Sequence, residues 1–272
     1  ILLTALKTIL LISQHHPLIF IPHLYHFYVR LNDSFEVRSL KLRILSALAS
    51  PSNADLILSE ITKYTGSNNS KLAALAVKAI EEMALIHQNI IPSVLITLLR
   101  LISRVSSSDT MVLSEIVSVM IKILRLKRGT ADETKILRHL CQKFLVINDP
   151  NTRASVLNIV GDMYDTHKEF APQLLRYVAQ HIDEEPPEVK IQALNLAMKI
   201  FAYEKCNSEE SENDSLLLPV YLIKVCERDS DFDIQDRARF LNALMKTKNE
   251  VLQSNLSKFF FLSPKEKEME DR

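Results

Sequence analysis

Four histidines near the start of the chain are the first candidates for chemistry: His15, His16, His23 and His26. His23 and His26 are three residues apart, so on a helix they would share a face and could bind a metal ion. The stretch has no nearby cysteine or carboxylate, because Asp33 comes only after the predicted helix. We therefore expect surface histidines and predict no metal site.

Three alternating aspartates, Asp229, Asp231 and Asp233, match the first half of a calcium-binding loop. That loop then requires a glycine at its sixth position and a glutamate at its twelfth. This chain has Ile234 and Phe240 at those positions. The aspartates therefore predict a turn and a helix cap.

Motifs for nucleophilic or phosphate chemistry are missing: the chain has no G-x-S-x-G, H-E-x-x-H or G-x-x-x-x-G-K. Cys141, Cys206 and Cys226 lie far apart, without metal-binding spacing, which is typical of free thiols in a reducing compartment. We predict a protein that is not an enzyme, with no catalytic, cofactor-binding or metal-binding residues and no cofactor. The sequence leaves the partner-binding residues unknown.

The composition favours a helical protein. The chain of 272 residues has only 3 glycines, which argues against a sheet-rich fold and against a phosphate-binding loop. Lys plus Arg equals Asp plus Glu at 33 each, so nucleic-acid binding is not expected, although a local basic patch for anionic lipid stays open. The apolar start, interrupted by Lys7 and lacking a methionine, predicts a fragment of a longer, soluble protein rather than a signal peptide or membrane span.

Six similar segments recur along the chain. Each has apolar residues at helical intervals and one or two basic residues near its start. Comparable positions are 35 to 45 residues apart, a period typical of armadillo and HEAT repeats. The segments are Glu36–Leu45, Ser70–Ala84, Met111–Leu124, Asn151–Tyr164, Glu188–Phe201 and Phe232–Met245. They predict an all-α, armadillo/HEAT-like superhelical solenoid of stacked helix pairs.

Prolines mark the predicted starts of four partner helices, since proline is favoured in the first helical turn. Pro22, Pro92, Pro172 and Pro219 are expected to open helices over His23–Leu31, Ser93–Ser103, Gln173–Ile182 and Val220–Glu227. The acidic, serine-containing stretch Glu204–Ser215 predicts a solvated, mobile linker, with a phosphorylated regulatory loop as an alternative.

The predicted domain organisation is one solenoid over residues 1–262, followed by a charged tail over 263–272 that begins a linker. In the segment around Asp233, the pairs Asp233–Arg237 and Asp236–Arg239 have helical neighbour spacing and are expected to tie the last repeat together. The predicted core contains Leu40, Leu42, Ile44, Leu45, Leu194, Leu196, Ile200, Phe240 and Leu244.

Several strings, in the same order along the chain, resemble the trunk of the β-adaptins. The sequence differs from that family pattern at Gln235, where the family has arginine, at Asn158 (tryptophan) and at Asp162 (glutamate). The resemblance covers residues 15 to 262, and the strings are most similar in sequence to the β subunits of the third adaptor-protein complex. The strings are Phe27–Arg30, Leu40–Leu45, Arg153–Leu157 with Ile159–Asp162, Ala171-Pro172, Val189–Leu196 and Asp233–Phe240.

This resemblance implies a large-subunit scaffold in vesicle-mediated protein transport, from Golgi or endosome to lysosome or vacuole. The implied partners are a second large adaptin, a medium chain and a small chain, with a small GTPase and an anionic membrane surface reached through the complex. The implied location is cytoplasmic, peripheral on Golgi and endosomal membranes and transport vesicles. We expect the helices from about Pro92 to Phe201 to line the contact with the medium chain.

Two alternatives stay open. A coatomer β-type subunit or another adaptin would share this biology at a different membrane. A general armadillo/HEAT scaffold, for nuclear transport or for a phosphatase, belongs to a different class. The absence of tryptophan argues against an armadillo importin, because such importins use repeated tryptophan and asparagine pairs on the inner helix.

Overall fold

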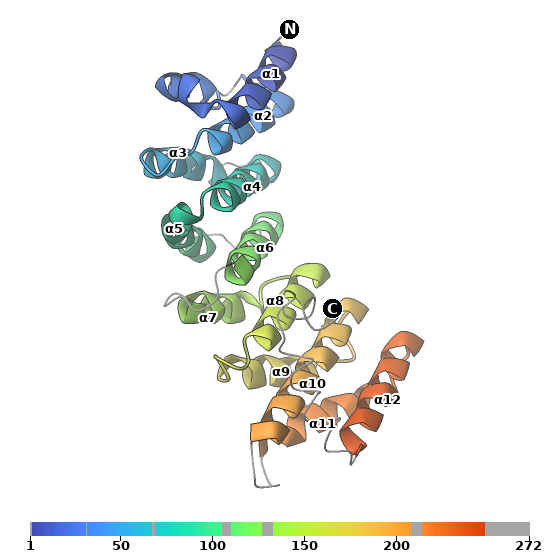
Figure 1. Ribbon diagram of the computed structural model, residues 1–272. Helices are drawn as coiled ribbons and strands as arrows, with labels where there is room; N and C mark the ends of the chain where they lie inside the picture. Colours follow the sequence, from blue (N-terminus) through green and yellow to red (C-terminus); the bar gives the residue numbers. More distant parts are fainter. Residues whose placement is uncertain are drawn as a thin grey trace, which may run out of the picture. The chain divides into compact units, whose positions relative to one another are not determined.

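The computed structural model describes residues 2–30, 32–66, 69–104, 110–126, 133–207 and 214–247. Every regular element in these ranges is a helix, and none is a β-strand (Figure 1). The chain divides into two compact units, residues 1–139 and residues 140–272. The division falls within α7 (Glu133–Lys143), and each unit has a core of its own.

The helices of the first unit form two layers. In one layer α1, α2, α4 and α6 pack in succession, and in the other α3 packs against α5. The 3-10 helix η2 packs against α2 of the first layer. Contacts of α3 with α4 and of α5 with α6 join the layers. The bounds are α1 (Leu2–His15), η1 (Pro17–Ile19), η2 (Ile21–Phe27), α2 (Phe35–Ala47), α3 (Ala54–Thr65), α4 (Ser70–Ile86), η3 (Gln88–Ile90), α5 (Ile91–Arg104) and α6 (Thr110–Leu126).

The second unit repeats this arrangement. Helices α8 and α12 both pack against α10, while α9 and α11 pack against each other and against α10. The central position of α10 explains why it is buried around most of its circumference, including Leu194, Leu196 and Ile200. The bounds are α8 (Pro150–Asp162), α9 (Phe170–Gln180), α10 (Pro187–Asn207), α11 (Asp214–Cys226) and α12 (Phe232–Lys246).

The two layers differ in how much of each helix is buried. Helix α5 buries one stripe at helical spacing, which includes Ile91, Val94 and Leu98, while Ile96 and Arg100 face outward. Helix α4, which packs against α2, α3 and α6, buries a wider surface in which alanines allow neighbouring helices to approach closely. Helix α5 is therefore amphipathic, with one buried stripe, whereas α4 is buried over a wider part of its surface.

All six predicted repeat segments are confirmed as helices: α2, α4, α6, α8, α10 and α12. Pro92 and Pro172 lie in the first turns of α5 and α9, as expected, whereas Pro22 lies in the 3-10 helix η2. The predicted helix start at Pro219 is wrong, because α11 already begins at Asp214. The missing N–H of Pro219 would have bonded to a carbonyl in the first turn of α11, so the helix loses only one hydrogen bond near its end.

The predicted core is correct for Leu42, Ile44, Leu45, Leu194, Leu196 and Ile200, all buried. Leu40 and Leu244 are only half-buried. The prediction that Phe240 lies in the core is wrong, since its side chain is 62% exposed. The buried stripe of α12 runs through Ala238 and Leu241, and Phe240 lies about 100° around the helix from Leu241.

The predicted linker at Glu204–Ser215 is shorter than expected. Helix α10 continues to Asn207 and α11 starts at Asp214, so both ends of the predicted linker are helical. Residues 208–213 and the charged tail at 263–272 lie outside the described residues.

Candidate functional site

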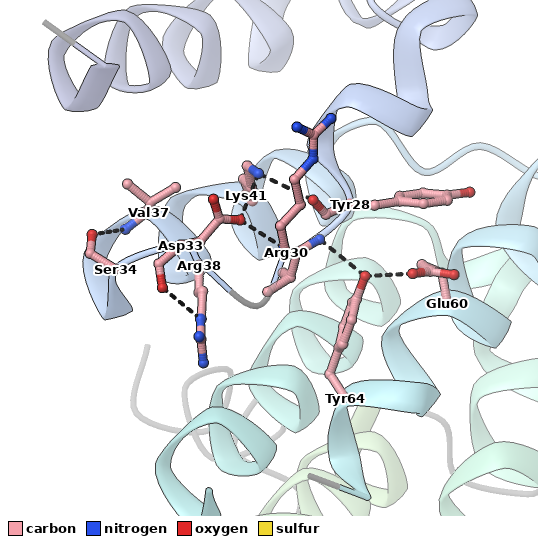
Figure 2. A network of polar contacts seen from close by, with 10 residues as sticks. Tyr28, Arg30, Asp33, Ser34, Val37, Arg38, Lys41, Glu60 and Tyr64 are labelled. Atoms are coloured by element: carbon pink, nitrogen blue, oxygen red, sulfur yellow. Dashed lines mark hydrogen bonds and ion pairs between the residues drawn. The ribbon is translucent and has the colours of Figure 1, made fainter.

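The first of the family-like strings, Phe27–Arg30, lies where the chain passes from η2 into α2 (Figure 2). The Nζ of Lys41 donates to the carbonyl of Tyr28 at 3.2 Å and to Oδ2 of Asp33 at 2.7 Å. The backbone N–H of Arg30 donates to the same Asp33 oxygen at 2.8 Å. Lys41, which belongs to the string Leu40–Leu45, thus holds the backbone of the preceding string, Phe27–Arg30, in place.

Tyr64 of α3, in the next helix pair, contacts the same stretch of backbone between η2 and α2. We call such a set of polar contacts between neighbouring helices or repeats a joint. The backbone N–H of Val29 donates to the Tyr64 hydroxyl at 3.0 Å, and that hydroxyl donates to the carboxylate of Glu60 (Figure 2). Burial and the hydrogen bond to Glu60 raise the pKa of Tyr64 above its ordinary value. The neutral phenol therefore persists at neutral pH and keeps the hydrogen bond in place.

The charge of Asp33 is matched by its surroundings. Burial by itself would raise the pKa of the Asp33 carboxyl, but hydrogen bonds from Lys41 and from the Arg30 backbone hold that pKa below its usual range. The side chains of Lys41 and Asp33 are only 9% and 14% exposed. A buried ion pair with additional hydrogen bonds is costly to break, because removing one partner leaves the other charge uncompensated.

A second type of joint uses the basic residue at the fourth position of a repeat helix. Lys190 of α10 bonds at 2.7 Å to Asp229, which lies in the loop before α12. Arg153 of α8 bonds to Glu185, which lies in the loop before α10. In α8 and α10 the basic residue near the start of the repeat helix therefore binds the loop that precedes the next repeat helix.

Arg153 also packs on an aromatic side chain. Its guanidinium lies 4.7 Å from the ring centroid of Phe144, which contacts the ring of Tyr177 edge-to-face at 6.1 Å. Among the described residues, Arg153 Nε and Glu185 Oε2 are buried without a hydrogen-bond partner. The stacking of guanidinium on the ring accounts for part of the stability of this joint.

A third set of polar contacts joins helices of the same layer. In the first unit, Glu82 of α4 accepts from Ser46 of α2 at 2.7 Å, and Lys122 of α6 bonds to Glu81 of α4 at 2.7 Å. In the second, Lys199 of α10 bonds to Asp162 of α8 at 2.5 Å. Each pair fixes the lateral register of two neighbouring helices.

In the string Ile159–Asp162, close helix packing explains why position 161 is a glycine. A Cβ added to Gly161 of α8 would lie 3.1 Å from Lys199 Cδ and 3.3 Å from Leu196 Cδ1, both of α10. Gly161 therefore allows the close contact that brings Asp162 and Lys199 together.

The histidines singled out from the sequence lie on the surface, as expected. The rings of His23 and His26 have centroids 6.0 Å apart. Within the described residues, no group of three or more His, Cys, Asp or Glu side chains is placed to hold a metal ion. Burial raises the pKa of the Cys141 and Cys226 thiols to about 12, so both are protonated at neutral pH.

The predicted turn and cap at the three aspartates are confirmed. Asp229 Oδ1 accepts from the Asp231 N–H at 3.0 Å, and Asp231, the N-cap of α12, accepts from the Asp233 N–H at 2.9 Å. Of the predicted surface pairs, Asp236–Arg239 is present at 3.4 Å, with both side chains more than half exposed. Asp233–Arg237 forms no ion pair among the described residues, so the last repeat is held by Lys190–Asp229 instead.

Sequence reasoning missed the acidic partners Asp33, Glu185 and Asp229, because each lies outside a repeat helix. A usable signal was present: in each case an acidic residue stands two or three residues before a repeat helix begins. The arrangement holds successive helices in place.

No single described helix is long and apolar enough to cross a bilayer. The helices Ser70–Ile86 and Gln88–Arg104 pass that test together but are bent by 117° at the break between them.

Comparison with known proteins shows where this arrangement recurs. The model of a solved assembly described as "Homology model of the full-length AP-3 complex in an intermediate open conformation" superimposes with a TM-score of 0.69. At 21% identity it covers 88% of this chain and 42% of that chain, and it shows that the fold is shared.

Curated relatives match over nearly the whole chain. The AP-3 complex subunit beta-1 of Mus musculus is 32% identical over 263 residues, which is 96% of this chain and 23% of that protein. The AP-3 complex subunit beta of Schizosaccharomyces pombe is 30% identical over 250 residues, 90% of this chain and 33% of that protein. The AP3-complex subunit beta-A of Arabidopsis thaliana is 29% identical over 256 residues. The chain thus spans a quarter to a third of the length of these relatives.

The family model described as the adaptin N terminal region matches residues 1–249. That range contains every joint described above, and the stacked helix pairs agree with the solved fold. The chain therefore belongs to the adaptin N terminal region family.

Proposed function

We propose that this chain is part of the trunk of the β subunit of an AP-3-type adaptor complex. Its role is that of a non-enzymatic scaffold in vesicle-mediated protein transport. The observation that carries the proposal is identity of about 30% with AP-3 β subunits of animals, a fungus and a plant, over 90% or more of this chain. Similarity over such distant organisms favours a shared role over a general interaction scaffold.

The joints described above suit this role physically. In a stack of helix pairs each repeat contacts only its neighbours, so small movements at many joints add up to a large change in curvature. Buried ion pairs such as Lys41–Asp33 keep each joint in register during such bending, because their directional hydrogen bonds permit only small displacements. A trunk of this kind can hold other subunits while it changes shape.

The proposed partners are a second large adaptin, a medium chain and a small chain. A small GTPase and anionic lipid would be reached through the assembled complex. The proposed location is cytoplasmic, peripheral on Golgi and endosomal membranes, with cargo bound for the lysosome or vacuole. The contact of the medium chain with the helices from about Pro92 to Phe201 stays a prediction.

Affinity capture of the tagged full-length protein from its own cells tests the proposal. We expect one second large adaptin, one medium chain and one small chain in equal amounts, identified by mass spectrometry. Reciprocal capture through the tagged medium chain should recover the protein that contains this chain. Recovery of coatomer subunits, a transport receptor or a phosphatase in place of these subunits would contradict the proposal and favour the corresponding alternative.

A further inference from the structure

Helix α11 of the second unit has an exposed row of side chains on its outward face. The helix packs against α9, α10 and α12, and the outward face is the side away from these three helices. The exposed residues on it are Leu217, Tyr221, Lys224 and Arg228, which follow one another at intervals of four, three and four positions. This spacing places them in one row along α11 and the turn that follows it.

The first half of this row is apolar. Leu217 and Tyr221 are 67% and 57% exposed. The neighbouring helix α9 instead exposes the polar side chains of Gln173, Arg176 and Gln180. A helix at the surface usually buries one apolar stripe and exposes polar side chains, whereas a helix that is apolar on all sides is usually buried. The outward face of α11 therefore has the composition of a surface that another molecule covers.

The second half of the row consists of two cations. Lys224 and Arg228 form no ion pair or side-chain hydrogen bond with any described residue. From Leu216 to Cys226 the helix has no aspartate or glutamate, and the carboxylate of Glu227 accepts from Asn242 of α12. The outward face of α11 thus has two positive charges and, from Leu216 onward, no carboxylate of its own. Ammonium and guanidinium groups offer only hydrogen-bond donors, and carboxylates are the acceptors that match them best.

We propose that the outward face of α11 binds an acidic segment of a partner polypeptide that also has apolar side chains. The apolar side chains cover Leu217 and Tyr221, and the carboxylates accept hydrogen bonds from Lys224 and Arg228. The row extends over about three helical turns, or roughly 16 Å at 1.5 Å per residue, so the segment contacts α11 over that length.

The charge of this face favours an acidic polypeptide over two other occupants. A basic segment would meet two cations without a carboxylate to offset them. An anionic membrane usually needs clusters of about four to eight basic residues, and this face has two. The inference goes beyond the proposed function and does not depend on it, because it rests on the second unit alone. Helix α11 also lies outside the range Pro92–Phe201 that is expected to contact the medium chain.

Site-specific photo-cross-linking in cells identifies the occupant. The full-length protein carries benzoylphenylalanine in place of Tyr221, which keeps an aromatic ring there, and the cross-linked segment is sequenced by mass spectrometry. We expect a polypeptide segment with a net negative charge over the three helical turns around the cross-link. Lys224→Glu together with Arg228→Glu should abolish this cross-link. The same photoreactive residue at Gln173, exposed on α9, is the matched control and should not capture the segment.

A synthetic peptide of the captured segment then measures the charge contact. Replacement of its carboxylates by amides should weaken binding to the purified full-length protein by about tenfold or more, as for lost charged hydrogen bonds. The Lys224→Glu, Arg228→Glu variant should bind the original peptide at least as weakly. It should bind a peptide with lysines in place of the carboxylates better than the wild-type protein does. Arg176→Glu, the reversal of an exposed charge on α9, should leave affinity unchanged.

The inference is overturned by any of four results. They are the absence of a cross-link from position 221, a cross-link to lipid, a captured segment without net negative charge, and a cross-link that persists in the charge-reversed variant. Circular dichroism checks that the charge-reversed variant is folded, and its binding of the lysine peptide is a gain that an unfolded protein could not show. Lys224→Gln with Arg228→Gln is the milder variant, and its affinity for the original peptide should lie between those of wild type and the charge-reversed variant.

Discussion

At the scale of single residues, the buried ion pairs are the most sensitive points of the structure. Lys190 and Asp229 are 9% and 6% exposed, and they connect α10 to the loop before α12. Burial by itself would raise the pKa of Asp229, but hydrogen bonds from Lys190 and from the Asp231 backbone hold it below its usual range. The charged form of Asp229 is therefore the form that the folded joint stabilises.

Lys190→Met should destabilise this joint by about 3–5 kcal/mol, since the Asp229 carboxylate would stay buried without its partner. Amide hydrogen exchange of α12 measures the effect. Lys224→Met, an exposed lysine on α11, is the matched control and should change exchange little. Adding Asp229→Asn to Lys190→Met should restore much of the loss. If the double variant is no better than the single one, the charge of Asp229 is not the cause.

The same pair predicts a pH dependence. A carboxyl whose folded pKa is lowered contributes stability that is complete above its unfolded pKa, about 3.9 for aspartate, and is lost as the pH falls through the folded pKa. Protection of α12 should therefore hold from pH 7 to about pH 5 and decline below about pH 4. In the Lys190→Met, Asp229→Asn double variant this part of the acid dependence should be absent. An unchanged acid profile would assign the loss to other carboxyls.

At the scale of elements, the burial pattern separates two helix faces that look alike in the sequence. Leu42 of α2 is 1% exposed, whereas Phe240 of α12 is 62% exposed. Leu42→Ala should lower the free energy of unfolding by about 2–5 kcal/mol, because it leaves a cavity between layers. Phe240→Ala should change it by about 0.5 kcal/mol or less. Urea unfolding of both variants, side by side, makes the comparison, and equal losses would refute the assigned register of α12.

The contact between α8 and α10 depends on Gly161. Gly161→Val should cost about 1–3 kcal/mol, since the added atoms would meet Leu196 and Lys199 at the closest point of the two helices. Gly66→Val is the control, because a Cβ there would meet only the Lys63 carbonyl, at 3.8 Å. The thermal unfolding midpoint compares the two variants. A larger loss at Gly66 would mean that the α8–α10 contact adjusts freely.

At the scale of the whole molecule, stability is expected to be local. Each repeat contacts only its neighbours, so a weakened joint should loosen adjacent helices first. Lys41→Met breaks the joint of Figure 2, and hydrogen exchange should rise in α2 and α4 more than in α6. Lys71→Met, an exposed lysine on α4, is the control. A uniform rise over all these helices would instead show that the unit unfolds as one cooperative body.

The sequence by itself determined the helical class, the repeat period and the six repeat helices. It did so because the spacing of apolar residues along the chain depends only on which face of each helix is covered. It also predicted the cap at Asp231, because turn and cap chemistry is local.

Only the tertiary structure decided which charges pair and which apolar residues stay exposed. Arg153 and Glu185 are separated by 32 positions and Lys190 and Asp229 by 39, so their pairing depends on how one repeat stacks on the next. Phe240 differs from the buried leucines only in which direction it faces, and the positions of the neighbouring helices set that direction.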